Sequence, residues 1–228
     1  MFLKSKYVVP AMLAFASAMG AGAQFYKLHG ASVSVGATGN YLETLTENPR
    51  PYTFSGVDPA SGVNLTRTYA NQQQDNTSSL GFLTSLQFHP VPWAGVEVNY
   101  GYQHYSERYT YTVSGLAARQ GSRVPVTTHE ATGAYQFHPK HIPFQPFVNI
   151  GGGAIDFVPT QGGPNQWRGA GLLETGFDIA MPYTQRKLAL RLQGRGLFYR
   201  APNFYNSAIS TGAWRVSAQP SASFVYRF

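Results

Sequence analysis

Apolar and polar residues alternate at every second position in eight separate segments of this 228-residue chain. Val96 and Val98 flank Glu97, for example. Side chains two residues apart share one face of a β-strand, so this period predicts strands with an apolar face and a polar face. No apolar stripe of helical spacing is longer than a turn. The predicted strands are 28–41, 77–89, 95–106, 126–138, 144–157, 167–181, 187–200 and 213–228.

The links between these segments alternate between long and short. The long links are 42–76, 107–125, 158–166 and 201–212, and the short ones centre on 90–93, 139–143 and 182–184, each of which contains proline. An outer-membrane barrel has long loops on one side of the membrane, tight turns on the other and an even number of strands. We therefore predict an all-β fold, an eight-stranded antiparallel up-and-down transmembrane β-barrel with long extracellular loops and short periplasmic turns.

The first 23 residues have the organisation of a secretory signal peptide. Lys4 and Lys6 precede an apolar run that is too short to span a membrane as a helix, and small residues precede Gln24. We predict a cleaved signal peptide at 1–23 and one barrel domain at 24–228. Removing two lysines and no acids lowers the formal charge from +7 to +5, which is too modest and dispersed to indicate a nucleic-acid partner.

Strand parity directs the charged side chains inward. Only 12% of the residues are charged, whereas a water-soluble sandwich would normally carry more charge on its outer faces. Buried charges must be paired, so we expect a network that plugs the lumen; the alternative is a network that rearranges to pass small ions. The predicted lumen residues are Glu97, Glu130, Glu174, Asp178, Arg168, Arg191, Arg195, Arg215 and Arg227.

The chain ends in Phe224, Tyr226 and Phe228 at alternate positions. This ending resembles the signal read by the outer-membrane barrel assembly machinery. With the signal peptide and the eight strands, the chain resembles the small OmpA/OmpX-like outer-membrane β-barrel family over essentially its whole mature length. The resemblance implies the outer membrane of a Gram-negative-type bacterium, periplasmic N- and C-termini, contact with lipopolysaccharide and outer-membrane lipid, and the assembly machinery as a partner during biogenesis.

The predicted role is structural and surface-interacting: a membrane anchor that displays extracellular loops. The longest link, 42–76, is where an extracellular ligand would bind, because loops carried by a rigid scaffold commonly hold binding residues. A narrow, porin-like channel for ions or small solutes is the alternative.

A lipid-modifying enzyme is the second alternative. His104 and Ser106 resemble the His-x-Ser element of lipid A deacylases of the PagL type, and strand parity places both on the lipid face. The corresponding element of that family lies nearer the C-terminus, and a carboxylate partner is not evident. We therefore predict a protein without catalytic residues.

Four histidines fall at the predicted periplasmic rim: His29, His89, His138 and His141. None has a close metal-ligand spacing. Two of them belong to a short repeat, Gln-Phe-His-Pro, which occurs at 87–90 and at 136–139 and marks equivalent rim positions. We predict neither a metal nor a cofactor.

Overall fold

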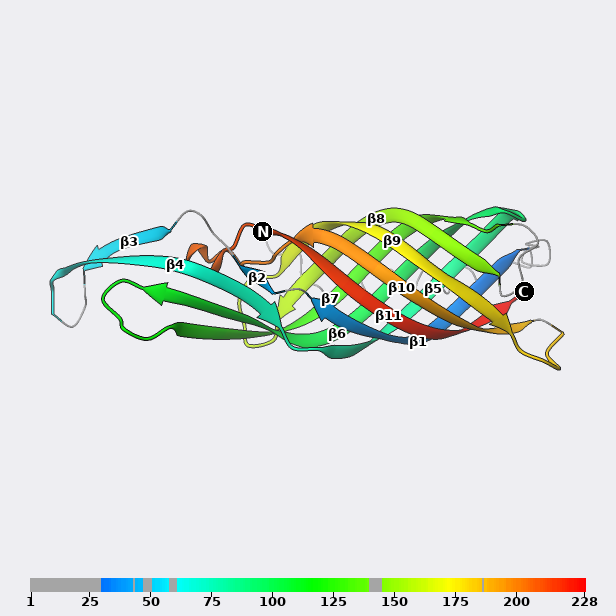
Figure 1. Cartoon of the computed structure of the whole chain (residues 1–228), viewed down its shortest axis with the longest axis horizontal. Helices are drawn as coiled ribbons and strands as arrows, with labels where there is room; N and C mark the ends of the chain where they lie inside the picture. The colour runs from blue at the N-terminus through cyan, green and yellow to red at the C-terminus, as the bar shows by residue number, and fades with distance from the viewer. Residues whose placement is uncertain (1–29, 43, 47–50, 58–60, 140–144, 186) are drawn as a thin grey trace.

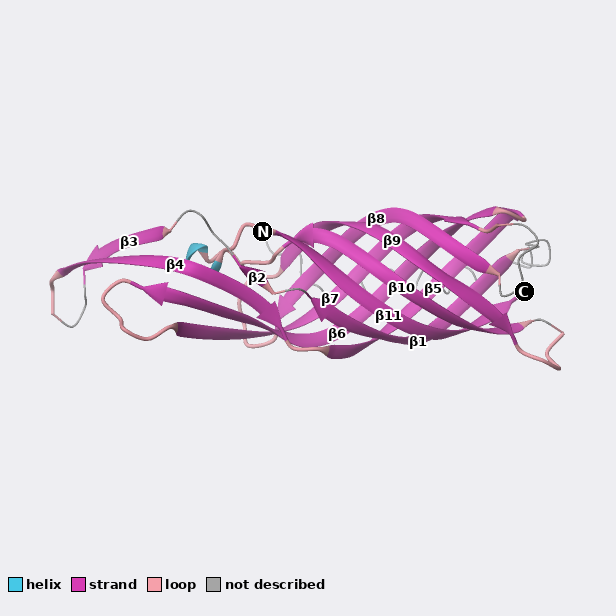
Figure 2. Cartoon of the chain, in the orientation of Figure 1, coloured by secondary structure: helices cyan, strands magenta, loops and turns pink. Residues whose placement is uncertain are grey.

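The computed structural model describes residues 30–228 except 43, 47–50, 58–60, 140–144 and 186. This part of the chain is mostly β-strand with one short 3-10 helix, η3 (Ser207–Ile209) (Figure 2). The predicted signal peptide, His29 and His141 lie outside the described residues. The strands are β1 (Ala31–Leu42), β2 (Leu45–Thr46), β3 (Tyr52–Val57), β4 (Asn64–Asn76), β5 (Ser79–Val91), β6 (Ala94–Val113), β7 (Gln120–Phe137), β8 (Pro146–Pro159), β9 (Gln166–Ala180), β10 (Leu188–Arg200) and β11 (Trp214–Arg227).

Eight of these strands form a closed antiparallel ring. In the order β1, β5, β6, β7, β8, β9, β10 and β11, each strand pairs with the next, and β11 pairs back with β1. Val35 on β1, for instance, is in register with Thr84 on one side and with Phe224 on the other. The strands wind obliquely around a cylinder (Figure 1). The predicted all-β up-and-down barrel of eight strands is confirmed.

The two ends of the barrel differ in shape. At one end, which we call the short-turn end, the chain passes from β5 to β6 through a tight turn, and the C-terminus is located there (Figure 1). At the other end, the hairpin end, β6 and β7 continue beyond the ring and pair with β4, which pairs with β3. A four-stranded sheet in the order β3-β4-β6-β7 therefore projects from the hairpin end.

This projecting sheet corrects two of the predicted links. Much of 42–76 forms β2, β3 and β4, and most of 107–125 belongs to β6 and β7. The side chains of β3 are exposed or half-buried on both faces, so no apolar face produces a period-two pattern. Tyrosine and threonine nevertheless favour extended backbone, and they are frequent in β3, β4 and the end of β6.

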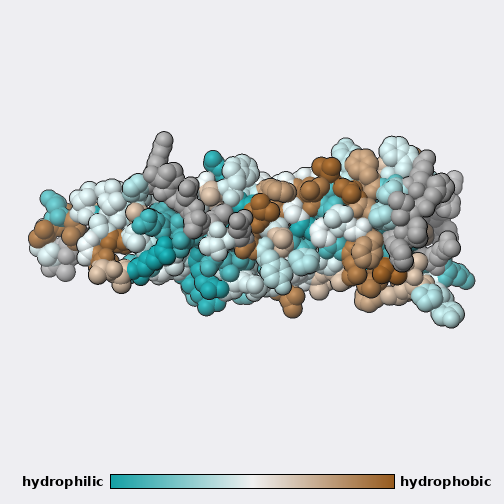
Figure 3. Space-filling view, in the orientation of Figure 1, coloured by the Kyte–Doolittle hydropathy of each residue, from teal (hydrophilic) through white to brown (hydrophobic). Residues whose placement is uncertain are grey.

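The interior of the ring is mostly polar, and its exterior is mostly apolar. Asn99, Gln136 and Asn149 are fully buried in its interior, whereas Val98 and Ile150 are about half exposed on its exterior. On the face shown in Figure 3, most apolar residues lie over the barrel half, while the projecting half is mainly pale or hydrophilic with a few apolar residues. Lipid is the solvent that suits this reversed arrangement, because a closed ring satisfies the backbone groups of every spanning strand. The protein is a transmembrane β-barrel.

Among the described residues, no helix is both long enough and apolar enough to span a membrane.

Candidate functional site: the charged lumen

The lower tier of the lumen, nearest the short-turn end, is organised by Arg191. Its Nε and Nη2 donate to the two carboxylate oxygens of Asp178, at 2.7 and 3.0 Å, and its Nη1 donates to Glu97 Oε2 at 3.1 Å. Arg227 Nη2 donates to Asp178 Oδ2 at 2.9 Å. Gln136 also donates to Glu97, at 3.1 Å. Two arginines and two carboxylates are thus neutralised together.

The middle tier is organised by Arg195. Its Nε donates to Glu174 Oε1, its Nη2 donates to Glu130 Oε1 at 2.6 Å, and its Nη1 donates to Gln219 at 2.9 Å. Asn149 joins this tier to the lower one, because its Nδ2 donates to Glu174 at 2.6 Å and to Glu97 at 3.1 Å. The two tiers therefore form one connected network.

The upper tier, nearest the hairpin end, pairs Arg215 with Glu107. Arg215 Nη1 donates to both carboxylate oxygens of Glu107, at 2.8 and 2.9 Å, and both side chains are fully buried. Gln74 on β4 donates to Glu107 at 3.1 Å. Gln74 and Tyr109 also donate to the carbonyl oxygen of Pro202, at 3.1 and 3.0 Å.

A collar of buried apolar and aromatic side chains separates the middle and upper tiers. Leu197 and Tyr199 follow Arg195 on β10, and the ring of Phe157 packs on Tyr199 with a centroid distance of 5.7 Å. Tyr105 and Ile155 belong to the same cluster. The lumen cavity lined by collar and middle-tier residues has a volume of only about 10 Å³. This is about the space for one water molecule.

The link between β10 and β11, residues 201–213, folds over the hairpin end of the ring; we call it the cap. Gln166 Oε1 accepts from the backbone N–H groups of Asn203 and Phe204, at 2.8 and 3.0 Å. Gln72 on β4 donates to the carbonyl oxygen of Ala208 at 2.8 Å. Side chains of β4 and β9 therefore hold the cap in place.

The nine charged residues predicted for the lumen all belong to inward-facing strand positions. Eight of them take part in the ion pairs just described; Arg168 instead donates to Asn203 Oδ1 of the cap at 3.4 Å. The predicted set of lumen residues lacks Glu107, because the sequence pattern assigns residue 107 to the start of a loop. Its signal was the continued alternation of Gln103, Tyr105 and Glu107 along β6, all of which are buried.

His104 and Ser106 face outward, on a surface hollow of about 390 Å³ that Arg123 also lines. His104 Nδ1 lies 3.1 Å from Thr127 Oγ1, and Ser106 is only 6% exposed. A histidine that activates a serine must hydrogen-bond to it. In this structure the imidazole is hydrogen-bonded to Thr127.

The C-terminal aromatic residues lie on the outside of the barrel. Phe224, Tyr226 and Phe228 are exposed, and the rings of Tyr226 and Phe228 meet edge to face at 5.2 Å. Their role in recognition by the assembly machinery remains a prediction.

At the short-turn end, outside the spanning strands, burial together with the charges of His89 and Arg191 lowers the pKa of His138 from 6.5 to about 4. The His138 imidazole is therefore neutral at pH 7. No group of three or more histidine, cysteine, aspartate or glutamate side chains suited to a metal occurs among the described residues.

The sequence matches no protein-family model and no curated protein. Among solved structures, the chain is similar to Ail, the attachment invasion locus protein of Yersinia pestis, which was solved in complex with the heparin analogue sucrose octasulfate. That similarity has 10% identity and a TM-score of 0.42 and covers 87% of this chain and 97% of Ail. Outer membrane protein AlkL, solved in lipid bilayers, has 14% identity and a TM-score of 0.44 over 91% of this chain and 95% of AlkL. Both are small outer-membrane β-barrels of the OmpA/OmpX-like type.

Proposed function

We propose that this protein is an outer-membrane anchor, a plugged barrel that holds the sheet of β3, β4, β6 and β7 outside the cell, with its termini in the periplasm. The observation that carries this proposal is the closure of the lumen by the three ion-pair tiers, the collar and the cap. A conducting barrel needs a continuous polar path. The collar around Phe157 and Tyr199 interrupts such a path.

The projecting sheet offers the surface for an extracellular partner. The rings of Tyr52, Tyr69 and Tyr111 form a row across three strands, with centroid distances of 6.0 and 5.6 Å. Tyr52 is exposed, and Tyr69 and Tyr111 are half-buried. Tyrosines with accessible rings are common anchors of protein interfaces. Within the described residues, the outer edge of β3 is also unpaired, and an extended peptide can add to a free strand edge. We infer that a ligand of segment 42–76 binds here, while the barrel itself contacts lipopolysaccharide and outer-membrane lipid.

The plug is tested by conductance of the refolded protein in a planar bilayer, with a heat-dependent gel shift as proof of folding. We expect no stable open level from the native chain. A stable conductance that changes in Arg191→Gln or Glu97→Gln, but not in a control variant at exposed Arg200, would contradict the plug and support a narrow channel.

The orientation can be tested separately, because the chain contains no cysteine. A cysteine at exposed Ser55 on β3 should react with a membrane-impermeant maleimide on intact cells. A cysteine at Tyr183, a fully exposed residue in a short turn, should react only after the outer membrane is permeabilised. The reverse pattern would overturn the proposed orientation.

A further inference from the structure

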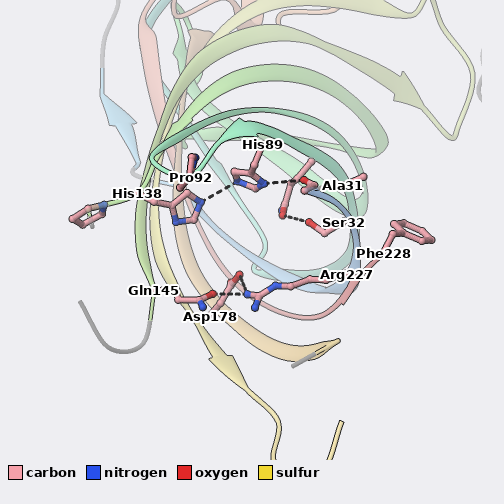
Figure 4. Close-up of a pocket in the computed structure, with 12 residues that line it drawn as sticks. Ala31, Ser32, His89, Pro92, His138, Gln145, Asp178, Arg227 and Phe228 are labelled. Carbon is pink, nitrogen blue, oxygen red and sulfur yellow. Dashed lines mark hydrogen bonds and ion pairs between the residues drawn. The ribbon is translucent and has the colours of Figure 1, made fainter. Parts of the chain in front are cut away.

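The two copies of the Gln-Phe-His-Pro repeat meet at the short-turn end of the barrel. They end β5 and β7, the two neighbours of β6, and their histidines point toward one another across the start of β6 (Figure 4). His89 Nε2 lies 3.0 Å from His138 Nε2. It also lies 2.6 Å from Gln136 Oε1.

One tautomer of His89 leaves a nitrogen lone pair inside this cluster. Gln136 uses its amide nitrogen to donate to Glu97, so its oxygen faces His89 as an acceptor. His89 Nδ1 lies 3.3 Å from the carbonyl oxygen of Gly30, which can only accept. His138 has its own backbone hydrogen bond to Pro146. A neutral His89 that donates through Nδ1 therefore directs the lone pair of Nε2 at another acceptor.

We propose that His89 Nε2, His138 Nε2 and Gln136 Oε1 bind a divalent transition-metal ion of the nickel, copper and zinc group. Two imidazole nitrogens 3.0 Å apart can both lie about 2.1 Å from one ion as adjacent ligands. Imidazole nitrogen favours these metals over magnesium or calcium. Backbone carbonyl groups that accept from the remote ring nitrogen are the usual outer partners of a metal-binding histidine.

Gly95 is an independent observation in favour of this site, because its lack of a side chain leaves room for the His89 ring. It lies on β6, in register with Gln136, and a Cβ atom there would lie 2.6 Å from His89 Cδ2 and 2.7 Å from the carbonyl oxygen of Phe88. Any larger residue would displace the His89 ring or the backbone at Phe88.

The cluster is accessible from the short-turn end. His89 and His138 line an open cavity of about 750 Å³, together with Asp178 and Arg227, which neutralise one another. Water can therefore reach the ion and supply further ligands. The positive charge of Arg191, which lies nearby, is offset by Asp178 and Glu97.

The test is metal binding by the untagged, refolded mature chain, measured by calorimetry with Zn²⁺ and by electron paramagnetic resonance with Cu²⁺. We expect one ion per chain, copper coupling to two imidazole nitrogens, and binding at least about tenfold weaker in His89→Gln, His138→Gln and Gly95→Ala. A His104→Gln control, at the other end of the barrel, should bind like the native chain. Heat-dependent gel mobility verifies that each variant has folded.

Three results would overturn the proposal. The first is no uptake of either ion, in which case a proton on His89 satisfies the same contacts. The second is binding that survives in the His89→Gln, His138→Gln double variant. The third is binding that requires His29 or His141, since the donor atoms would then be others than those assigned.

Discussion

Arg195 Nη2 lies 2.6 Å from Glu130 Oε1, although β8 and β9 separate their strands in the ring. The same guanidinium pairs with Glu174 on the adjacent strand β9. Arg195 on β10 therefore links β9, its neighbour in the ring, to the more distant strand β7 through the lumen. Its side chain is fully buried, so the two carboxylates depend on it for neutralisation.

We predict that Arg195→Leu destabilises the barrel strongly. Removing one partner of a buried ion pair leaves uncompensated charge and costs about 3–5 kcal/mol. The urea dependence of unfolding in lipid vesicles, followed by tryptophan fluorescence, measures this cost. Arg200→Leu, on the same strand but exposed, is the matched control and should unfold close to the native midpoint. Equal midpoints for the two variants would show that the middle tier does not stabilise the fold.

We predict that arginine is costly at Val98 and tolerated at Val57. Both valines are exposed, at 54% and 62%, but Val98 is on the ring and Val57 is on the projecting strand β3. Arginine on the lipid face near the midplane costs about 2–4 kcal/mol, whereas in water it costs little. Unfolding free energies of Val98→Arg and Val57→Arg in vesicles test this contrast. A similar loss at both positions would contradict the assignment of lipid to the ring alone.

The ring could be predicted from the sequence because lipid and lumen impose opposite polarity on its two faces. The alternation is clear on β10 from Leu188 to Arg195, beyond which the inward-facing Leu197 belongs to the apolar collar. The projecting sheet could not be predicted in this way, because β3 is not covered by an apolar environment on either face. Alternation of apolar and polar residues marks a strand whose two faces contact different environments. The alternation is absent where both faces of a strand contact water.

Parity also predicted which charges face inward, but not their partners. Arg191 and Glu97 are 94 residues apart and on strands that are not neighbours, so only the closed ring brings them together. The contacts of Gln74 with the cap could not be predicted either, because the sequence pattern assigns 42–76 to a loop and does not indicate strand β4. The pairing of His89 with His138 likewise depends on two turns that flank a third strand, which a search for ligand spacing within one segment does not detect.

We predict that Gly151→Ala destabilises the barrel and that Gly169→Ala does not. A Cβ atom at Gly151 would overlap the carbonyl oxygen of Gly133 on β7, whereas a Cβ at Gly169 meets nothing within 4 Å. Gly151 and Gly153 thus allow β7 and β8 to approach closely. The fraction of heat-shifted, folded protein after refolding measures the difference. Equal yields and equal urea midpoints would show that the strands can separate without cost.

We predict that losing the polar contacts of Gln74 and Tyr109 releases the cap. In a Gln74→Leu, Tyr109→Phe double variant, the Pro202 carbonyl oxygen loses both donors, and Glu107 loses the Gln74 hydrogen bond. Cleavage within 201–213 by a protease added to intact cells should then become faster. Thr53→Val, which removes an exposed hydroxyl contact on β3, is the control. Unchanged cleavage in the double variant would mean that Gln72 and Gln166 hold the cap without help.

We predict that Ser106→Ala leaves the membrane lipid unchanged. Ser106 lies two residues from His104 on β6, and the His104 imidazole is hydrogen-bonded to Thr127, so we expect no base to activate the serine. Mass spectra of lipid A from cells that produce the native chain, the Ser106→Ala variant or no barrel should be the same. Loss of an acyl chain that depends on both Ser106 and His104 would instead establish a deacylase and would place the active site on the outer face of β6.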